Sequence, residues 1–158
     1  MREILFRGKR KDNGEWVYGF YIENELFDGR LEPSIIPVDE KGAALFDDDG
    51  YDIEIKVNPE TVGQDTGVTD GKETGIFEGD IVKIHLSGKP AIGVVEFGIT
   101  GIAAYIVKNI DKVSSNYVLE FDKPNLYEVI GNVFDNPELM EGKKWITIQS
   151  AGRRQLIS

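Results

Sequence analysis

Residues 58–107 read NPETVGQDTGVTDGKETGIFEGDIVKIHLSGKPAIGVVEFGITGIAAYIV, a turn-rich loop followed by the densest apolar run of the chain. Within it, residues 81–86, 91–97 and 102–107 have the composition of short β-strands, and two more are expected at 117–121 and 128–133. Short strands separated by turns every 8–12 residues predict a small barrel or sandwich. Gly79-Asp80, placed before the first strand, resembles the entry to an SH3-like barrel, with the Asp80 side chain bonding local backbone N–H groups.

The first part of the chain predicts a hairpin followed by an irregular segment. Asn13-Gly14 favours a type I′ turn, because both central residues of that turn need positive φ. Strands are expected at residues 3–6 and 16–22, with a basic loop from Arg7 to Lys11. Pro33 and Pro37 indicate an edge strand or an extended segment, and residues 53–57 alternate as a half-buried strand with Glu54 and Lys56 facing water.

The expected fold is therefore mainly β with short helical turns. An N-terminal hairpin and acidic irregular segment occupy residues 1–57, an SH3-like small β-barrel occupies residues 58–142, and a basic tail follows from 143 to 158. A short helical turn is expected after Pro59. A helix start is expected at Pro137, where Asp135 or Asn136 can serve as the cap.

Three phrases resemble the YopX family of phage and prophage proteins. They are FRGKRKDNGEWVYG at residues 6–19, PETVGQDTGVTDGKETGIFEGDIVKI at residues 59–84 and EVIGNVFDNPELM at residues 128–140. The resemblance spans roughly residues 2–140, so the whole chain is expected to be a single YopX-like domain built from the sub-modules above. The resemblance implies a fold and a phage setting but carries no catalytic residue, and in that family the second phrase joins the front of the molecule to its second half.

The composition places the protein among globular, reducing-compartment proteins. The chain has 158 residues, 41% of them hydrophobic, and no cysteine, which excludes disulfides and thiolate metal sites. No signal peptide and no apolar run long enough to span a membrane are apparent. We expect a protein in the cytoplasm of a bacterial host cell, without a membrane association.

The charge is unevenly distributed along the chain. The net charge is −10, with fifteen acids and four bases between residues 28 and 80, and four bases but no acid between residues 143 and 158. An acidic field of this size repels phosphate backbones, so it disfavours broad nucleic-acid binding.

One group of residues remains a candidate interaction site. It combines basic side chains near the N-terminus with two tryptophans: Arg7, Lys9, Arg10, Lys11, Trp16 and Trp145. Exposed rings, including Tyr18 and Tyr21, could stack on single-stranded nucleic acid, or the acidic middle could mimic DNA and act on a host factor. Core packing of the rings is the more common role of aromatics on strands.

Three motifs suggest chemistry, and each has a simpler structural interpretation. Asp65-Thr66-Gly67 is also a good turn sequence and lacks the second carboxylate of an aspartic protease. Asp47-Asp48-Asp49 lacks the spacing of a calcium loop, so a solvated turn is favoured. His85, the single histidine, is expected to point outward from a strand. We therefore expect no enzyme, no cofactor and no metal.

The tail contains apolar residues beside its four positive charges. A strand is expected at residues 145–149. Because an exposed apolar strand tends to find a second chain, the protein is expected to form a homo-oligomer with the tail involved, and to bind an unknown host or phage protein. Two alternatives remain open: the tail folds onto its own barrel, or it is a sequence that was added for expression of the protein.

Overall fold

A computed structural model describes residues 3–98, 103–111 and 115–141. The strands in these ranges are β1 (Phe6–Lys9), β2 (Trp16–Glu25), β3 (Leu31–Pro37), β4 (Ile55–Lys56), β5 (Gly63–Thr69), β6 (Gly75–Phe77), β7 (Asp80–Ile84), β8 (Ala91–Phe97), β9 (Tyr105–Asn109), β10 (Tyr117–Val118) and β11 (Tyr127–Asn132). Short 3-10 helices follow at η1 (Pro59–Thr61), η3 (Pro124–Leu126) and η4 (Pro137–Met140). The predicted class, mainly β with short helical turns, is confirmed.

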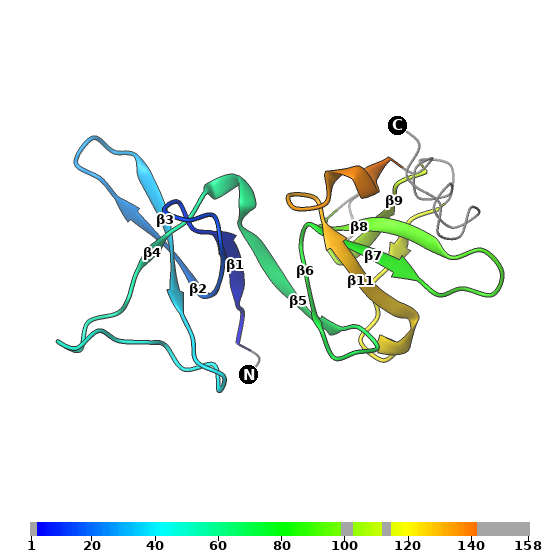
Figure 1. Cartoon of the computed structure of the whole chain (residues 1–158), viewed down its shortest axis with the longest axis horizontal. Coiled ribbons are helices and arrows are strands. Elements are labelled where there is room, and N and C mark those ends of the chain that lie inside the picture. Colours follow the sequence, from blue (N-terminus) through cyan, green and yellow to red (C-terminus); the bar gives the residue numbers. More distant parts are fainter. Residues whose placement is uncertain (1–2, 99–102, 112–114, 142–158) are drawn as a thin grey trace. The chain divides into compact units, whose positions relative to one another are not determined.

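The chain divides into two compact units, residues 1–65 and 66–158. One antiparallel sheet has the strand order β4-β3-β2-β1-β5-β6, and a second has the order β10-β9-β8-β7-β11 (Figure 1). Strand β5 starts in the first unit and ends in the second. The segment containing η1 and β5 therefore joins the two halves of the chain, as the resemblance implied. In the described ranges, no helix is both long and apolar enough to cross a membrane.

The N-terminal hairpin is present, but its first strand was wrongly placed. β1 runs from Phe6 to Lys9 rather than over residues 3–6, so Arg7 and Lys9 belong to a strand and not to a loop. In the register with β2, Gly8 lies opposite Val17 and Lys9 lies opposite Trp16. Gly8 hides the alternation in the sequence, because a glycine gives no apolar signal although its position faces the core.

The turn of this hairpin is not type I′. Arg10 N–H donates to the Glu15 carbonyl at 2.9 Å, which leaves four residues in the loop. Gly14 has φ 74°, whereas the sole non-glycine residue with positive φ among those described is Glu73. Asn13 contributes through its side chain instead, since its Oδ1 accepts the Glu15 N–H at 2.9 Å.

The core of the first unit is small. Val17, Ile35 and Val57 are buried together on one face of its sheet, with four half-buried neighbours: Phe6, Tyr21, Ile55 and Val62. A Cβ on Gly8 would lie 3.1 Å from Cβ of Val57, so the glycine leaves room for that side chain. The strand expected at 53–57 shrinks to β4, with Glu54 and Lys56 exposed as predicted.

The proline-flanked segment forms a regular strand. β3 pairs with β2 over seven residues and with β4 only at Ser34 and Ile35. The expectation of an edge strand or an extended segment was therefore wrong, because β3 lies between β2 and β4 in the sheet. Its pairing on the β4 side is short, although the Pro33 carbonyl on that side also accepts the Val57 N–H at 3.1 Å.

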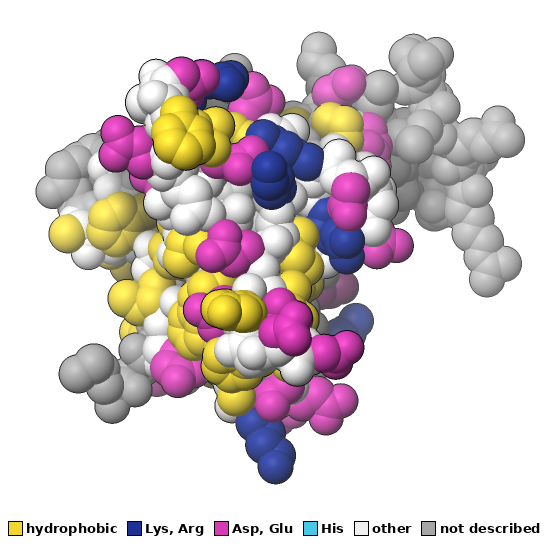
Figure 2. Space-filling model, turned by 90° about the vertical axis from the view of Figure 1, so that its left-hand side faces the viewer, with side chains coloured by type: hydrophobic (Ala, Val, Ile, Leu, Met, Phe, Trp, Pro, Cys, Tyr) yellow, Lys and Arg dark blue, Asp and Glu magenta, His cyan; other side chains and the backbone are white. Residues whose placement is uncertain are grey.

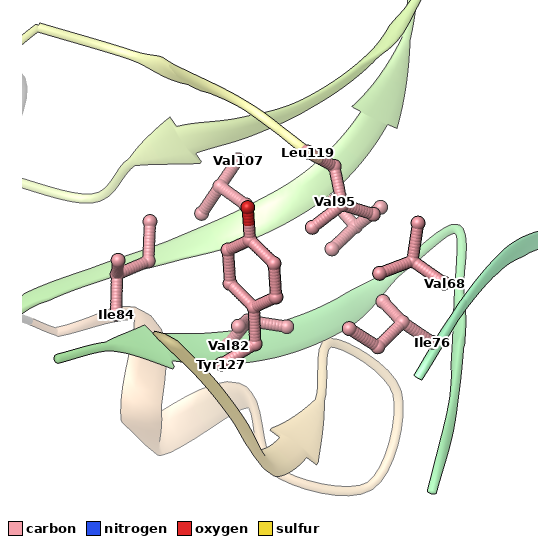
Figure 3. Packing of buried hydrophobic residues seen from close by; sticks show 8 residues of the cluster. All are labelled: Val68, Ile76, Val82, Ile84, Val95, Val107, Leu119 and Tyr127. Carbon is pink, nitrogen blue, oxygen red and sulfur yellow. The ribbon is translucent and has the colours of Figure 1, made fainter. Parts of the chain in front are cut away.

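The second unit has a larger core, which lies on one face of the five-stranded sheet. Its buried members come from six strands and the segment after β10: Val68, Ile76, Val82, Ile84, Val95, Val107, Leu119 and Tyr127. The Tyr127 ring stands among these aliphatic side chains in Figure 3. Its hydroxyl oxygen accepts the Glu120 N–H at 2.9 Å, so the buried polar atom is satisfied.

The opposite face of this sheet is also covered. Ile81, Ile92 and Val94 are buried there against half-buried residues that include Leu139 of η4. Pro137 occupies the start of η4 as predicted, but no side chain caps that helix. Asn136 instead accepts the Asn132 N–H through Oδ1 at 3.2 Å, so the expected cap was wrong.

Strand positions in the second unit follow the sequence closely. β8 covers the predicted residues 91–97, and β7, β9 and β11 differ from their expected ranges by a few residues, whereas β10 keeps only Tyr117 and Val118 of residues 117–121. The strand expected at 145–149 and the whole basic tail lie outside the described residues. Closure of this unit into an SH3-like barrel stays a prediction.

Candidate interaction surfaces

Trp16 carries two cations over its ring. The Arg7 Cζ lies 4.6 Å from the ring centroid, and the Lys9 Nζ lies 5.4 Å from it. The register explains the arrangement, because Lys9 lies opposite Trp16 and Arg7 lies opposite Tyr18 on one face of the hairpin. Cation–π contacts of this length stabilise the position of the ring. Arg7 and Lys9, which were expected to contact a ligand together with Trp16, therefore hold its ring in place.

Arg7 differs from the other basic candidates because it is only 5% exposed. Arg7 belongs to β1, and its guanidinium lies over the Trp16 ring. Lys9 is half-buried and Lys11 is exposed, so these two lysines are the more accessible basic groups of the hairpin.

Arg10 is engaged by a carboxylate of the same turn. Its Nε and Nη2 donate to the two Asp12 oxygens at 2.9 and 2.7 Å. This hydrogen bond raises the pKa of Arg10 and holds the pKa of Asp12 below its ordinary value. The charge of Arg10 is thus locally neutralised. Trp145, the remaining candidate, lies outside the described residues.

The aromatic side chains of β2 point to two different faces. Tyr18 is on the Trp16 face and is 44% exposed, whereas Tyr21 packs on Phe6 in the core with ring centroids 5.3 Å apart. Burial, followed by the 2.7 Å hydrogen bond to Glu23, raises the pKa of Tyr21 to about 12. Trp16, Tyr18 and Tyr21 therefore do not form one stacking platform.

A second surface was not singled out from the sequence. We call residues 38–54, between β3 and β4, the acidic arm. It contains seven carboxylates and one lysine, and none of its seventeen residues is buried. Figure 1 shows it as an extended segment with two bends, which leaves the strands and returns to β4. The sequence analysis identified this region only as acidic and irregular, and it did not predict that its apolar side chains are exposed.

Two similar turns hold the acidic arm in shape. In the first, Asp39 Oδ1 accepts the N–H groups of Lys41 and Ala43 at 2.8 and 3.0 Å. In the second, Asp47 Oδ1 accepts the N–H groups of Asp49 and Tyr51 at 3.0 and 2.9 Å. The second turn contains the supposed calcium motif, and its first carboxylate is occupied by backbone donors, which confirms the turn interpretation.

Large apolar side chains are exposed in the acidic arm and at the β2–β3 hairpin tip. In the arm, Leu45, Phe46 and Tyr51 are 38%, 60% and 73% exposed. At the tip, Phe27 is fully exposed and borders an open hollow of about 390 Å³ with Glu25 and Leu26. The side of Figure 1 with β3, β4 and the arm faces the viewer in Figure 2, which shows hydrophobic side chains interspersed with acidic ones.

The motifs that suggested chemistry have structural roles in the second unit. Thr66 Oγ1 donates to the Ile76 carbonyl at 2.7 Å, which ties the Asp-Thr-Gly segment into the β5–β6 hairpin. Asp80 begins β7, and its Oδ2 accepts the Phe77 N–H at 2.8 Å across a turn in which Gly79 has φ 84°. The predicted local role of Asp80 is confirmed.

His85 follows the end of β7 and is exposed as expected. Its Nε2 lies 3.0 Å from the Glu128 carboxylate, and both side chains face solvent. An exposed pair of this kind contributes little to stability. Among the described residues, no group of three potential ligands is placed to hold a metal ion.

These features define a mainly antiparallel β protein of two compact units. The chain belongs to the YopX protein family, whose family model matches residues 5–141. Among curated proteins, none matches the chain.

A solved structure shares the fold. It is the crystal structure of protein EF1440 from Enterococcus faecalis, with 18% sequence identity and a TM-score of 0.50. The similarity covers 89% of this chain and 99% of that one, so it extends over both units. At this identity it supports the fold and nothing about activity.

Proposed function

We propose that this protein is a non-enzymatic accessory protein of a phage or prophage, which acts in the host cytoplasm as a self-associating protein-interaction module. One observation carries the proposal. In the described part of residues 1–65, three hydrophobic residues are buried, whereas seven large ones are exposed: Ile4, Tyr18, Phe27, Leu31, Leu45, Phe46 and Tyr51. Exposed apolar groups in this proportion are typical of surfaces that another protein covers.

In the second unit, hydrogen bonds attach the turn between β5 and β6 to β11. Gly71 N–H donates to the Tyr127 carbonyl at 3.1 Å, and Asp70 accepts the Val129 N–H at 3.1 Å. The β5–β6 turn thereby covers the outer edge of β11, which is protected from pairing with another chain. This link is also what favours an SH3-like closure of the unit.

Self-association is tested by the mass of the protein in solution. Light scattering after size exclusion is measured for the full chain and for a chain ending at Glu141, with circular dichroism to check that the shorter chain keeps its β structure. We expect a dimer for the full chain and a monomer for the shorter one. Equal monomeric masses at all concentrations would contradict self-association.

Binding of another protein is tested by affinity capture from phage-infected or prophage-carrying cells. The expected result is a reproducible partner that is lost when Phe27 and Leu31, which are exposed at the β2–β3 hairpin tip, are both changed to Ser. Capture that fails across several hosts, or that is unaffected by these substitutions, would count against the interaction role.

Binding of single-stranded nucleic acid is the alternative, and the cations over Trp16 are the observation in its favour. Such binding would fall steeply with salt. Titration with a labelled oligonucleotide at low salt tests this alternative, because a protein that binds single-stranded nucleic acid has to bind it under these conditions. The Arg10 guanidinium is already bound to the Asp12 carboxylate, and Tyr21 packs against the core of the first unit. Because both residues are engaged within the protein, they favour the protein-interaction role.

A further inference from the structure

The acidic arm combines exposed rings and free carboxylates on one short turn. Phe46 forms an isolated β-bridge with Asp52, and Asp47 to Asp49 follow Phe46 directly. Within the described part of the chain, the carboxylates of Asp48, Asp49 and Asp52 make no hydrogen bond or ion pair. A binder for this turn therefore needs an apolar group for the rings and positive charge for the acids.

The arm is already organised for such a contact. Asp47 N–H donates to the Tyr51 carbonyl at 2.8 Å, and Gly50 N–H donates to the Asp47 carbonyl at 3.0 Å. Leu45 is tied to the sheet because its N–H donates to the Pro37 carbonyl at 2.9 Å. A backbone that is held before binding loses less conformational entropy when a partner arrives.

Charge decides what covers the arm. Two arms in contact would bring together net charges of −6 each, which is unfavourable at short range. Residues 143–158 have the complementary composition, with four bases, no acid and the apolar residues Trp145, Ile146 and Ile148. Sixteen residues reach about 50 Å when extended, which is ample for the two turns of the arm.

We propose that residues 143–158 of one chain bind the acidic arm of a second copy, and that the exchange is reciprocal. The apolar residues of the tail cover Leu45, Phe46 and Tyr51, while its lysines and arginines lie against the acids of the second turn. Two such contacts in a closed dimer reinforce each other, because the second forms within an existing complex. This inference rests on the proposed self-association and names the surface responsible.

Charge reversal in the full-length protein tests the contact. One variant combines Asp48→Lys with Asp49→Lys, and another combines Lys143→Glu with Lys144→Glu. Analytical ultracentrifugation should show that each variant dimerises about tenfold or more weakly than the unaltered protein, because like charges then meet at both contacts. An equimolar mixture should recover dimers, since in the heterodimer one contact keeps its original charges and the other has both signs reversed.

A matched variant controls for general changes in charge and hydrophobicity. Glu25→Lys with Glu60→Lys makes the same charge change at exposed positions outside the arm, and it should dimerise like the unaltered protein. If the arm variant stays fully dimeric, or if mixing restores nothing, the proposed contact is wrong although self-association stands. If the unaltered protein is monomeric throughout, self-association and this contact both fail.

Discussion

The carboxylate of Asp70 accepts a hydrogen bond from the backbone N–H of Val129, which lies 59 residues further along the chain, at 3.1 Å. The same side chain accepts the N–H groups of Lys72 and Thr74, both at 2.9 Å. A single buried carboxylate thus closes its own turn and attaches that turn to β11. Burial raises the pKa of Asp70, but these three hydrogen bonds outweigh it, and the pKa lies below the ordinary value.

The first prediction is that Asp70→Asn destabilises the protein and flattens its response to acid. Because the folded pKa is below the unfolded one, the carboxylate contributes stability above the ordinary pKa of 3.8 and loses it as the pH falls through the folded pKa. We expect a loss of about 1–3 kcal/mol at neutral pH. Urea unfolding at pH 6 and pH 3 measures it, and the drop between them should be smaller in the variant.

Asp122→Asn provides the control for this measurement, since Asp122 is an exposed carboxylate of the same unit. It should leave both the neutral stability and the acid response close to those of the unaltered protein. A variant at Asp70 that behaves like the one at Asp122 would show that the link to β11 contributes nothing.

The sequence could predict some of these features because their causes are local. Gly79 and Asp80 form the expected turn, since a positive φ and a side chain bonded three residues away are properties of the segment itself. The Asp70 link could not be predicted, because its partner Val129 is distant in the chain. The position of β1 was missed for a related reason: the core role of Gly8 appears only when Val57 packs beside it.

The candidate surfaces show the same limit. Leu45, Phe46 and Tyr51 are large apolar residues of the kind usually found in a core, and only the fold shows that they remain exposed. Conversely, the charge of Arg7 suggested an accessible contact residue, but Arg7 is buried in β1. The sequence correctly showed an excess of acidic residues in this region. It could not show that the apolar side chains of residues 38–54 stay exposed, because this depends on the segment lying between β3 and β4 without a strand of its own.

The second prediction compares two glycines of the first hairpin. Gly14 needs its positive φ but has nothing within 4 Å of a built Cβ, whereas a Cβ on Gly19 would lie 1.9 Å from the Ile36 carbonyl oxygen. Gly14→Ala should therefore cost about 1 kcal/mol through backbone strain alone. Gly19→Ala should cost about 3 kcal/mol or more, because two paired strands must separate. Thermal melts of both variants decide, and equal costs would contradict this account.

The third prediction concerns Asp80 and its bond to the Phe77 N–H. Asp80→Ala removes the acceptor in a position that is 2% exposed, so we expect a loss of about 0.5–2 kcal/mol of stability. Asp80→Asn keeps a carbonyl acceptor of the same shape and should retain part of it. Oligomeric mass should be unchanged in both variants, and a stable Ala variant with altered mass would instead place Asp80 in an interface.

The last prediction is that Glu73→Gly stabilises the protein. Three turns share one hydrogen-bond pattern, beginning at Asp39, Asp47 and Asp70, and in each the fourth residue has positive φ. Glycine fills that place in the first two, but Glu73 adopts φ 64° in the third, where a side chain is strained. Relief of the strain, partly offset by the greater freedom of glycine when unfolded, should add about 0.5–1 kcal/mol. The urea midpoint measures the gain, with Lys72→Gly in the same turn as the control that should lose stability because its φ is already favourable.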